Sequence, residues 1–251
     1  MTVAILSALQ TELDLLIESL DGPDRSEIAD WPIWVGTYRS SSVALAKAGL
    51  GKVNTAALSA LLWDRIRPSL MVFTGVAGGL DPSLGVGDVV VGERTVQHDT
   101  GVIAPGGKLE RYQAGHIPFY NPTDEDGYRP SSSTLATMRR VIPTARLTTV
   151  LERQPTVTFG TILTGDQFLR DEGTRQHLFT DFGAQAIEME GAALAQTAAR
   201  LGVDHLVIRA LSDLAQGEAV VHFDRFVPEV SANSARLVLA LLTALDEGDQ
   251  R

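Results

Sequence analysis

The sequence predicts a three-layer α/β sandwich, because short apolar runs alternate along the chain with segments of helical periodicity. Several of these runs contain almost no polar residues, which is expected of strands covered by helices on both faces. The chain has 251 residues, of which 44% are hydrophobic and 21% are charged, a composition typical of a globular protein. We expect a single domain over 1–251.

Runs rich in Val, Ile, Leu or Thr predict the strands, and segments with helical spacing predict the helices. The predicted strands cover 3–7, 43–47, 70–75, 87–96, 160–164 and 205–212. The predicted helices cover 8–20, 52–66, 191–200 and 230–245, with Gly22-Pro23 and Gly202 as stop signals. The stretch 100–130, rich in Gly, Pro and aromatic residues, breaks this rhythm. Such an insertion is more often a functional or interface loop than a spacer.

Composition excludes several classes of function. The chain carries 21 Lys and Arg against 31 Asp and Glu, so its formal net charge is −10, which argues against a nucleic-acid partner. It has no cysteine, which excludes disulfides, thiolate catalysis and cysteine-based metal sites and is compatible with a reducing cytosol. No basic segment precedes the first short apolar run, and no run approaches the roughly 20 apolar residues of a membrane span. We therefore expect a cytoplasmic protein with no membrane partner.

Polar or glycine-rich stretches follow several predicted strands, where ligands of open α/β sheets gather. The stretches are "SALQTE", "GVAGG", "TGDQF" and "SD". A fifth, "AIEME", places Glu188 and Glu190 just before an apolar helix, although a buried carboxylate must be paired, hydrogen-bonded or neutralised. The spacing of two directs both acids to one side of an extended segment. A binding site at this edge of the sheet is the prediction.

Seven motifs carry a resemblance to a known family. They are "AILSALQTELDLL" (4–16), "AGLGKVNTA" (48–56), "TGVAGGLDPSLGVGDVVV" (74–91), "HD" (98–99), "TGDQF" (164–168), "AIEMEGAALAQ" (186–196) and "VIRALSDLA" (207–215). In this order they resemble the 5'-methylthioadenosine/S-adenosylhomocysteine nucleosidases of the nucleoside phosphorylase and nucleosidase superfamily. The resemblance implies an αβα sandwich with a central mixed sheet, a homodimer, and hydrolysis of a 5'-substituted adenosine to adenine without metal or cofactor.

The resemblance implies that Glu12 and Asp213 are catalytic. In the family, the equivalent of Glu12 orients and deprotonates the attacking water, and the equivalent of Asp213 donates a proton to N7 of adenine. Ser212 would orient Asp213. Without the family, Glu12 is interpreted as a helix-start acid and Asp213 as a helix N-cap.

The resemblance also implies a set of substrate contacts. Glu190 would accept a hydrogen bond from a ribose hydroxyl, and Glu188 would support the water site or Arg209. Phe168 would stack on adenine, although core packing explains a phenylalanine equally well. The backbones of Met189 and Leu169 would hold sugar and base. The other expected contacts come from the glycine-rich turn at Val76, Ala77 and Gly78, where Val76 stands at a position that is serine in some relatives.

Several alternatives stay open from the sequence. "GLGKVN" (49–54) suggests a dinucleotide loop, but Asn54 replaces the third glycine of that motif. The "HD" pair has no metal-ligand spacing and is expected to support structure or the dimer. A nucleoside-binding protein without catalysis, a phosphorolytic relative and an aminodeoxyfutalosine hydrolase are the other candidate functions. Phosphorylases of the family carry basic phosphate-binding residues, whereas the acid at Glu12 favours water.

Overall fold

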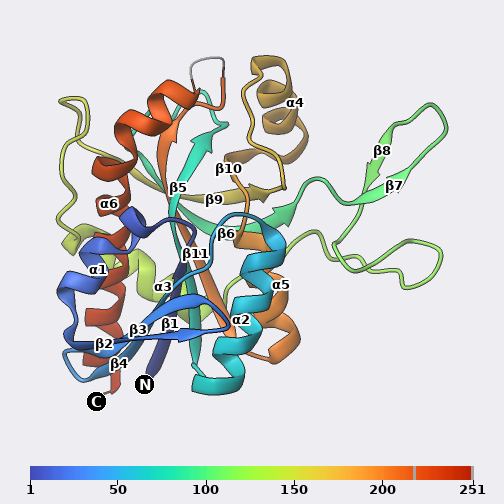
Figure 1. The fold of residues 1–251 in the computed structure, drawn as a ribbon. Helices are drawn as coiled ribbons and strands as arrows, with labels where there is room; N and C mark the ends of the chain where they lie inside the picture. Colours follow the sequence, from blue (N-terminus) through green and yellow to red (C-terminus); the bar gives the residue numbers. More distant parts are fainter. Residues whose placement is uncertain (217–218, 250–251) are drawn as a thin grey trace.

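The computed structural model describes residues 1–216 and 219–249, and within them it places nine strands in one mixed sheet (Figure 1). The strand order is β10-β9-β6-β11-β5-β1-β4-β3-β2. The strands are β1 (Thr2–Ser7), β2 (Asp21–Ile28), β3 (Trp31–Tyr38), β4 (Ser41–Lys47), β5 (Leu70–Gly79), β6 (Val89–Gln97), β9 (Val157–Thr164), β10 (Ala184–Glu188) and β11 (Asp204–Asp213). A separate hairpin is formed by β7 (Gly101–Ile103) and β8 (Leu109–Arg111).

Helices cover both faces of the sheet, so the predicted three-layer sandwich is confirmed. In Figure 1, α1 and α6 lie on one side of the central strands and α2 and α5 lie on the other. Alternate residues of β1 serve the two cores, since Val3 and Ile5 pack in one and Ala4 and Leu6 in the other. The helices are α1 (Asp14–Ser19), α2 (Lys52–Ile66), α3 (Ser132–Val141), α4 (Glu172–Phe182), α5 (Gly191–Leu201) and α6 (Ala219–Asp249), with 3₁₀ turns η1 (Gln10–Glu12) and η2 (Ile142–Thr144).

The sheet is bent so that two distant segments meet. Strand β5 runs parallel to β1 and β11, while β6 runs antiparallel to β11. The end of β5 also pairs antiparallel with β10, with Gly78 opposite Ile187 and Gly79 opposite Ala186. This added pairing brings the glycine-rich turn beside the segment that carries the two glutamates.

The predicted helix over 8–20 is wrong as one element. Leu9 is extended, with φ −112° and ψ 153°, and the chain then forms η1 followed by the six-residue helix α1. The Glu12 carboxylate accepts a hydrogen bond from the Leu9 amide at 2.8 Å, which holds a turn where a continuous helix was expected. Gly22-Pro23, predicted as a stop signal, lies inside β2, an edge strand that the sequence pattern did not reveal. The β2–β3 hairpin therefore adds two strands to that edge of the sheet.

The other predicted elements are present, most of them longer than expected. Helix α2 has the predicted bounds, and α5 ends one residue later than predicted. Helix α6 begins at Ala219 and contains Pro228. Helices α3 and α4 were not predicted. No helix in the described part of the chain combines the length and apolar character needed to cross a bilayer.

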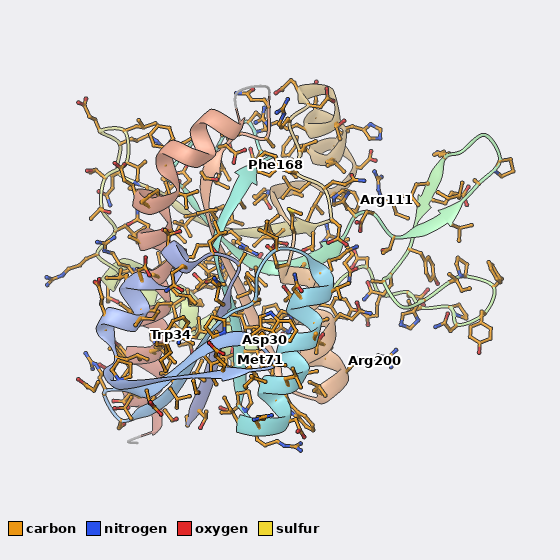
Figure 2. The ribbon with its side chains drawn as sticks, in the orientation of Figure 1. Asp30, Trp34, Met71, Arg111, Phe168 and Arg200 are labelled. Atoms are coloured by element: carbon orange, nitrogen blue, oxygen red, sulfur yellow. The ribbon has the colours of Figure 1, made fainter. Side chains whose placement is uncertain are left out.

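The irregular stretch 100–130 forms an arm that extends away from the body of the molecule (Figure 1). Figure 2 shows Arg111 near the point where this arm leaves the sandwich. Arg111 forms an ion pair with Asp181 of α4 at 2.7 Å and lies 4.8 Å from the centre of the Phe182 ring. Phe119 and Tyr120 are 80% and 81% exposed. The arm is thus anchored at its base and presents aromatic side chains to the surroundings.

Candidate active site

All twelve predicted site residues line one cavity of about 290 Å³. It lies where the turn after β1, the ends of β5, β10 and β11, and the loop after β9 converge. The predicted residues that line it are Glu12, Val76, Ala77, Gly78, Phe168, Leu169, Glu188, Met189, Glu190, Arg209, Ser212 and Asp213. The structure therefore brings them together, while their individual roles stay predictions.

Glu12 is held at the cavity wall by backbone donors from two elements. Its side chain is buried, and its two oxygens accept hydrogen bonds from the amides of Leu9 at 2.8 Å and Val76 at 2.9 Å. Gly75 has φ +149° and passes so close that a Cβ there would collide with the Glu12 carboxylate. Burial raises the pKa of Glu12, although the Arg209 charge and the two amides oppose this effect. A carboxylate of raised pKa is a better proton acceptor than an exposed one.

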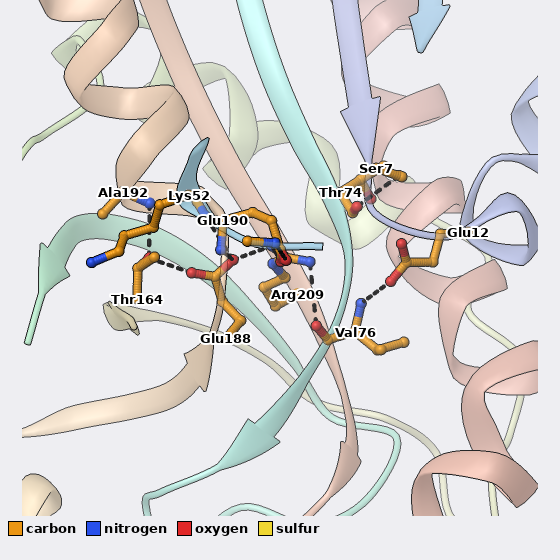
Figure 3. Close-up of polar contacts among 12 residues, drawn as sticks. Ser7, Glu12, Lys52, Thr74, Val76, Thr164, Glu188, Glu190, Ala192 and Arg209 are labelled. Atoms are coloured by element: carbon orange, nitrogen blue, oxygen red, sulfur yellow. Dashed lines mark hydrogen bonds and ion pairs between the residues drawn. The ribbon is translucent and has the colours of Figure 1, made fainter. Parts of the chain in front are cut away.

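Arg209 is fully buried in the centre of a carboxylate network (Figure 3). Its guanidinium forms ion pairs with Glu188 and, at 3.2 Å, with Glu190, and it donates to the Val76 carbonyl at 3.3 Å. Burial alone would lower the pKa of Arg209, but the neighbouring glutamates outweigh burial and raise it. Burial also raises the pKa of Glu190 to about 7, with Arg209 opposing and Glu188 adding to the rise. The prediction that Glu188 supports Arg209 is consistent with this contact.

The two glutamates differ in what they hold. Glu188 accepts hydrogen bonds from the amides of Glu190 at 3.0 Å and Gly191 at 2.7 Å, at the start of α5, where a negative charge is favourable. It also accepts a hydrogen bond from the Thr164 hydroxyl. Glu190 instead accepts from the Gly51 amide at 2.8 Å. Glu188 thus joins β9, β10 and α5, whereas Glu190 links the cavity to the start of α2.

Asp213 ends β11 and is buried at the cavity. Its carboxyl accepts hydrogen bonds from the Ser212 hydroxyl at 2.9 Å and from the Ala215 amide at 2.8 Å. A Cβ on Gly78 would come within 3.1 Å of the same carboxyl. Helix α6 begins at Ala219, six residues after Asp213, so Asp213 is not the N-cap of that helix, and its contact with the Ala215 amide closes a turn instead. Ser212 contacts Asp213 directly, and its orienting role stays a prediction.

The rest of the lining is mostly apolar and includes residues that the sequence interpretation missed. Phe168 is 47% exposed, so its ring is not a packed core side chain. Figure 2 labels it beside the end of β5. The additional lining residues are Ala8, Leu9, Leu50, Gln167, Ile187 and Ala215. All six lie inside the quoted motifs, so motif membership was the signal that could have found them.

The "GLGKVN" segment is not arranged as a phosphate loop. Its Gly51 amide donates to Glu190, and its Lys52 amide donates to Asp166 at 3.0 Å. Both donors at the start of α2 are therefore engaged by carboxylates. In the "HD" motif, Asp99 forms an ion pair with Lys52 at 2.8 Å, and the His98 amide donates to the Thr164 carbonyl.

The charge balance of the cavity limits the chemistry it can support. Its described lining contains four carboxyl side chains and one cation, Arg209, and that cation is already paired with two of the carboxylates. Such a site favours a substrate that develops positive charge and disfavours a phosphate anion. A buried base and a second buried acid at different walls can serve acid–base chemistry on one bound molecule.

Comparison with known proteins identifies the family. The model of the phosphorylase superfamily matches residues 2–243. The 5'-methylthioadenosine/S-adenosylhomocysteine nucleosidase of Mycobacterium tuberculosis is 44% identical over 250 residues, which are 97% of this chain and 98% of the relative. The chain belongs to this nucleosidase family of the phosphorylase superfamily.

Solved structures of nucleosidases agree with this assignment. The enzyme of Neisseria meningitidis in complex with methylthio-immucillin-A has a TM-score of 0.84 and 31% identity, over 97% of this chain and 99% of that one. The enzyme of Colwellia psychrerythraea in complex with adenine has a TM-score of 0.84 and 33% identity, over 98% and 96%. The nucleosidase fold therefore extends over nearly the whole chain, including all the strands that carry the cavity.

Proposed function

We propose that this protein hydrolyses the N-glycosidic bond of 5'-methylthioadenosine, S-adenosylhomocysteine or a related 5'-substituted adenosine. The observation that carries the proposal is the cavity's charge arrangement. Glu12 is buried at its wall, and Arg209, the cation of its described lining, is already neutralised by Glu188 and Glu190. Nothing in that lining offers a free positive charge to a phosphate nucleophile, so water is the nucleophile that fits. The complexes of relatives with adenine and with a methylthio nucleoside analogue support the substrate class.

In the proposed reaction, Asp213 donates a proton to N7 of adenine while the bond between C1' and N9 breaks. The bond electrons go to the purine, which leaves as neutral adenine, and the ribose ring develops positive charge. Glu12 takes a proton from water as its oxygen attacks C1', so the products are adenine and a free 5-substituted ribose. Acid assistance to the leaving group and base assistance to water are the two parts of glycoside hydrolysis.

The remaining predicted residues have positioning roles in this proposal. Phe168 stacks on the base and the Leu169 backbone hydrogen-bonds it, while Glu190 and the Met189 backbone hold the ribose. The Glu188–Arg209 pair fixes the wall against which the water lies. Val76 gives that wall a backbone amide, already engaged with Glu12, and no hydroxyl. Ala77 and Gly78 allow the nucleoside to approach the backbone closely.

The experiment that tests the proposal is a substrate panel in phosphate-free, metal-chelated buffer. Methylthioadenosine, S-adenosylhomocysteine, aminodeoxyfutalosine and inosine are each incubated with the protein, with and without added phosphate. We expect adenine and a reducing 5-substituted ribose from the first two, at rates that phosphate does not change. Turnover that requires phosphate and yields ribose 1-phosphate would refute the hydrolase. Preference for aminodeoxyfutalosine would keep the reaction as N-glycosidic bond hydrolysis and change only the preferred substrate.

Three further statements belong to this proposal. All of 1–251 acts as one nucleosidase domain, because strands from both ends of the sequence share one sheet. The protein is cytoplasmic, a proposal that the absence of cysteine supports. The functional unit is a homodimer in which the arm closes the 5' side of the partner's cavity, because Phe119 and Tyr120 are too exposed for an isolated chain.

A further inference from the structure

Three charged side chains meet outside the cavity, at a point where three segments join. Lys52 is the first residue of α2, Asp99 stands at the base of the arm, and Asp166 lies in the loop after β9. The Lys52 ammonium lies 2.8 and 2.9 Å from the two oxygens of Asp99 and 3.7 Å from Asp166. The Asp166 amide also donates to Asp99 at 3.1 Å. We name these three residues the lysine latch.

The lysine latch is connected to the cavity on two sides. Gly51, the residue before Lys52, donates its amide to Glu190 at 2.8 Å. Gly51 has φ +91° and provides no side-chain cap for α2, so Asp166 takes that place by accepting the Lys52 amide. On the other side, Asp166 is followed by Gln167, Phe168 and Leu169, all of which line the cavity. The lysine latch is therefore one residue away from the Gly51–Glu190 contact and directly precedes the loop that carries Phe168.

The electrostatics of the latch depend on the lysine. The side chains of Lys52 and Asp99 are 17% and 19% exposed, so water screens their pair less than a surface pair. Burial opposes ionisation of Asp99, but the hydrogen bond from Lys52, the hydrogen bond from the Asp166 amide, and the charges of Lys52 and His98 together hold the pKa of Asp99 below its usual range. If Lys52 were neutral, Asp99 and Asp166 would repel each other across the Asp166 amide, and the loop that carries Phe168 would be displaced.

We propose that Lys52 is a positioning residue for this site, holding the 165–169 loop and the Gly51–Glu190 contact in one arrangement and tying both to the base of the arm. The inference rests on the proposed function only for the identity of the molecule that the loop binds. Lys52 does not touch the reacting atoms in this arrangement. Its effect on activity passes through Phe168, Leu169 and Glu190.

The test uses Lys52→Met, Asp99→Asn, the double variant of both, and Arg153→Met as a matched control. Arg153 forms an ion pair with Asp88 that is also 2.8 Å long and does not line the cavity. We expect Lys52→Met to bind adenine about tenfold more weakly and to raise KM more than it lowers kcat, within the roughly 2- to 150-fold coupling of contacting groups. In Asp99→Asn the side-chain oxygen can still accept the Asp166 amide but the group carries no charge, so the double variant should recover most of the lost affinity.

A second measurement separates this inference from the proposed function. Amide hydrogen exchange in the ligand-free protein should become faster at 165–169 and at Gly51 in Lys52→Met, return toward the wild-type rate in the double variant, and stay unchanged in Arg153→Met. If wild-type protein fails to hydrolyse nucleosides, the proposed function fails while this exchange result still decides the latch. Wild-type exchange and adenine affinity in Lys52→Met, or no recovery in the double variant, would overturn the inference. If Lys52→Met does not fold, Asp99→Asn alone must show about threefold weaker adenine binding.

Discussion

Replacing Glu12 with glutamine changes charge and hydrogen bonding at one buried point, and the structure allows the two effects to be separated. The two carboxylate oxygens accept from the amides of Leu9 and Val76. A glutamine side chain has one oxygen, so its NH₂ group must face one of these backbone N–H donors, which cannot reverse direction. Asp213→Asn differs in this respect, because one of its partners is the Ser212 hydroxyl, which can turn to accept.

The magnitudes follow from these contacts. Glu12→Gln loses one hydrogen bond to a charged group, worth about 1.5–3 kcal/mol of stability. That loss is partly offset because burying the carboxylate was itself unfavourable, as its raised pKa indicates. Asp213→Asn should destabilise the fold less than Glu12→Gln. The kcat of each variant should be about 100- to 10,000-fold lower than that of the wild type, because this is the usual contribution of a general acid or base.

The assay compares adenine release with release from a substrate whose base departs readily without protonation. The second substrate needs Asp213 less but still needs an activated water, so it should partly rescue Asp213→Asn and rescue Glu12→Gln much less. Affinity for a non-hydrolysable analogue should change little in Asp213→Asn. Near-native turnover in both variants, with thermal unfolding that shows a folded protein, would contradict the proposed roles of Glu12 as general base and Asp213 as general acid. Both residues would then have structural roles only.

The remaining predictions concern the base, the ribose and the arm. Phe168→Ala should weaken adenine binding by about 5- to 150-fold, since base–aromatic stacking contributes roughly 1–3 kcal/mol, and calorimetry with wild-type affinity would rule out stacking. Because the pKa of Glu190 in the folded protein is raised to about 7, protonated Glu190 contributes stability that is complete below about pH 4.5 and is lost as the pH rises through 7. The free energy of unfolding measured with urea should therefore fall by up to about 3 kcal/mol over this pH range, and Glu190→Gln should remove that fall. The same pH dependence of the unfolding free energy in wild type and Glu190→Gln would refute the prediction. Replacing Phe119 and Tyr120 with serine should shift light scattering from dimer to monomer and raise KM for methylthioadenosine, whereas a fully active wild-type monomer would exclude the dimer.

The central strands could be predicted because they are apolar on both faces. Val3–Ser7 or Leu70–Gly75 contain almost nothing but core residues, and such runs have few other places in a globular fold. The β2–β3 hairpin could not be predicted in the same way, since seven of the eight β2 residues are exposed and an edge strand is selected by its neighbour more than by its own sequence. The helix expected over 8–20 begins late because Leu9 is extended and Glu12, three residues later, accepts the Leu9 amide as a first-turn acid does at a helix start.

The site shows the same division between local pattern and long-range contact. Eleven of the twelve predicted lining residues come from the motifs, and Leu169 directly follows one. Each of these motifs contains or follows the end of a strand, and the β5–β10 pairing brings the ends of β9 and β10, which run opposite to β5 and β11, to the same place. The link from Gly51 to Glu190 joins backbone to side chain across 139 positions of sequence, and no periodicity encodes such a contact. The contacts of Lys52 could not be predicted for the same reason, since its partners Asp99 and Asp166 come from two other segments.

The two acids in "AIEME" differ in what each one contacts. Glu188 contacts Arg209, Thr164 and the first amides of α5, so its side chain is held in place by the protein itself. Glu190 shares Arg209 at a longer distance and has a pKa raised by burial to about 7, so its ionised form is less fully stabilised in the ligand-free site. A sugar that develops positive charge would lower that pKa and gain from the ionised glutamate, and this interaction grows as the glycosidic bond breaks. These contacts support the proposal that Glu188 holds the wall of the site and that Glu190 interacts with the ribose in the transition state.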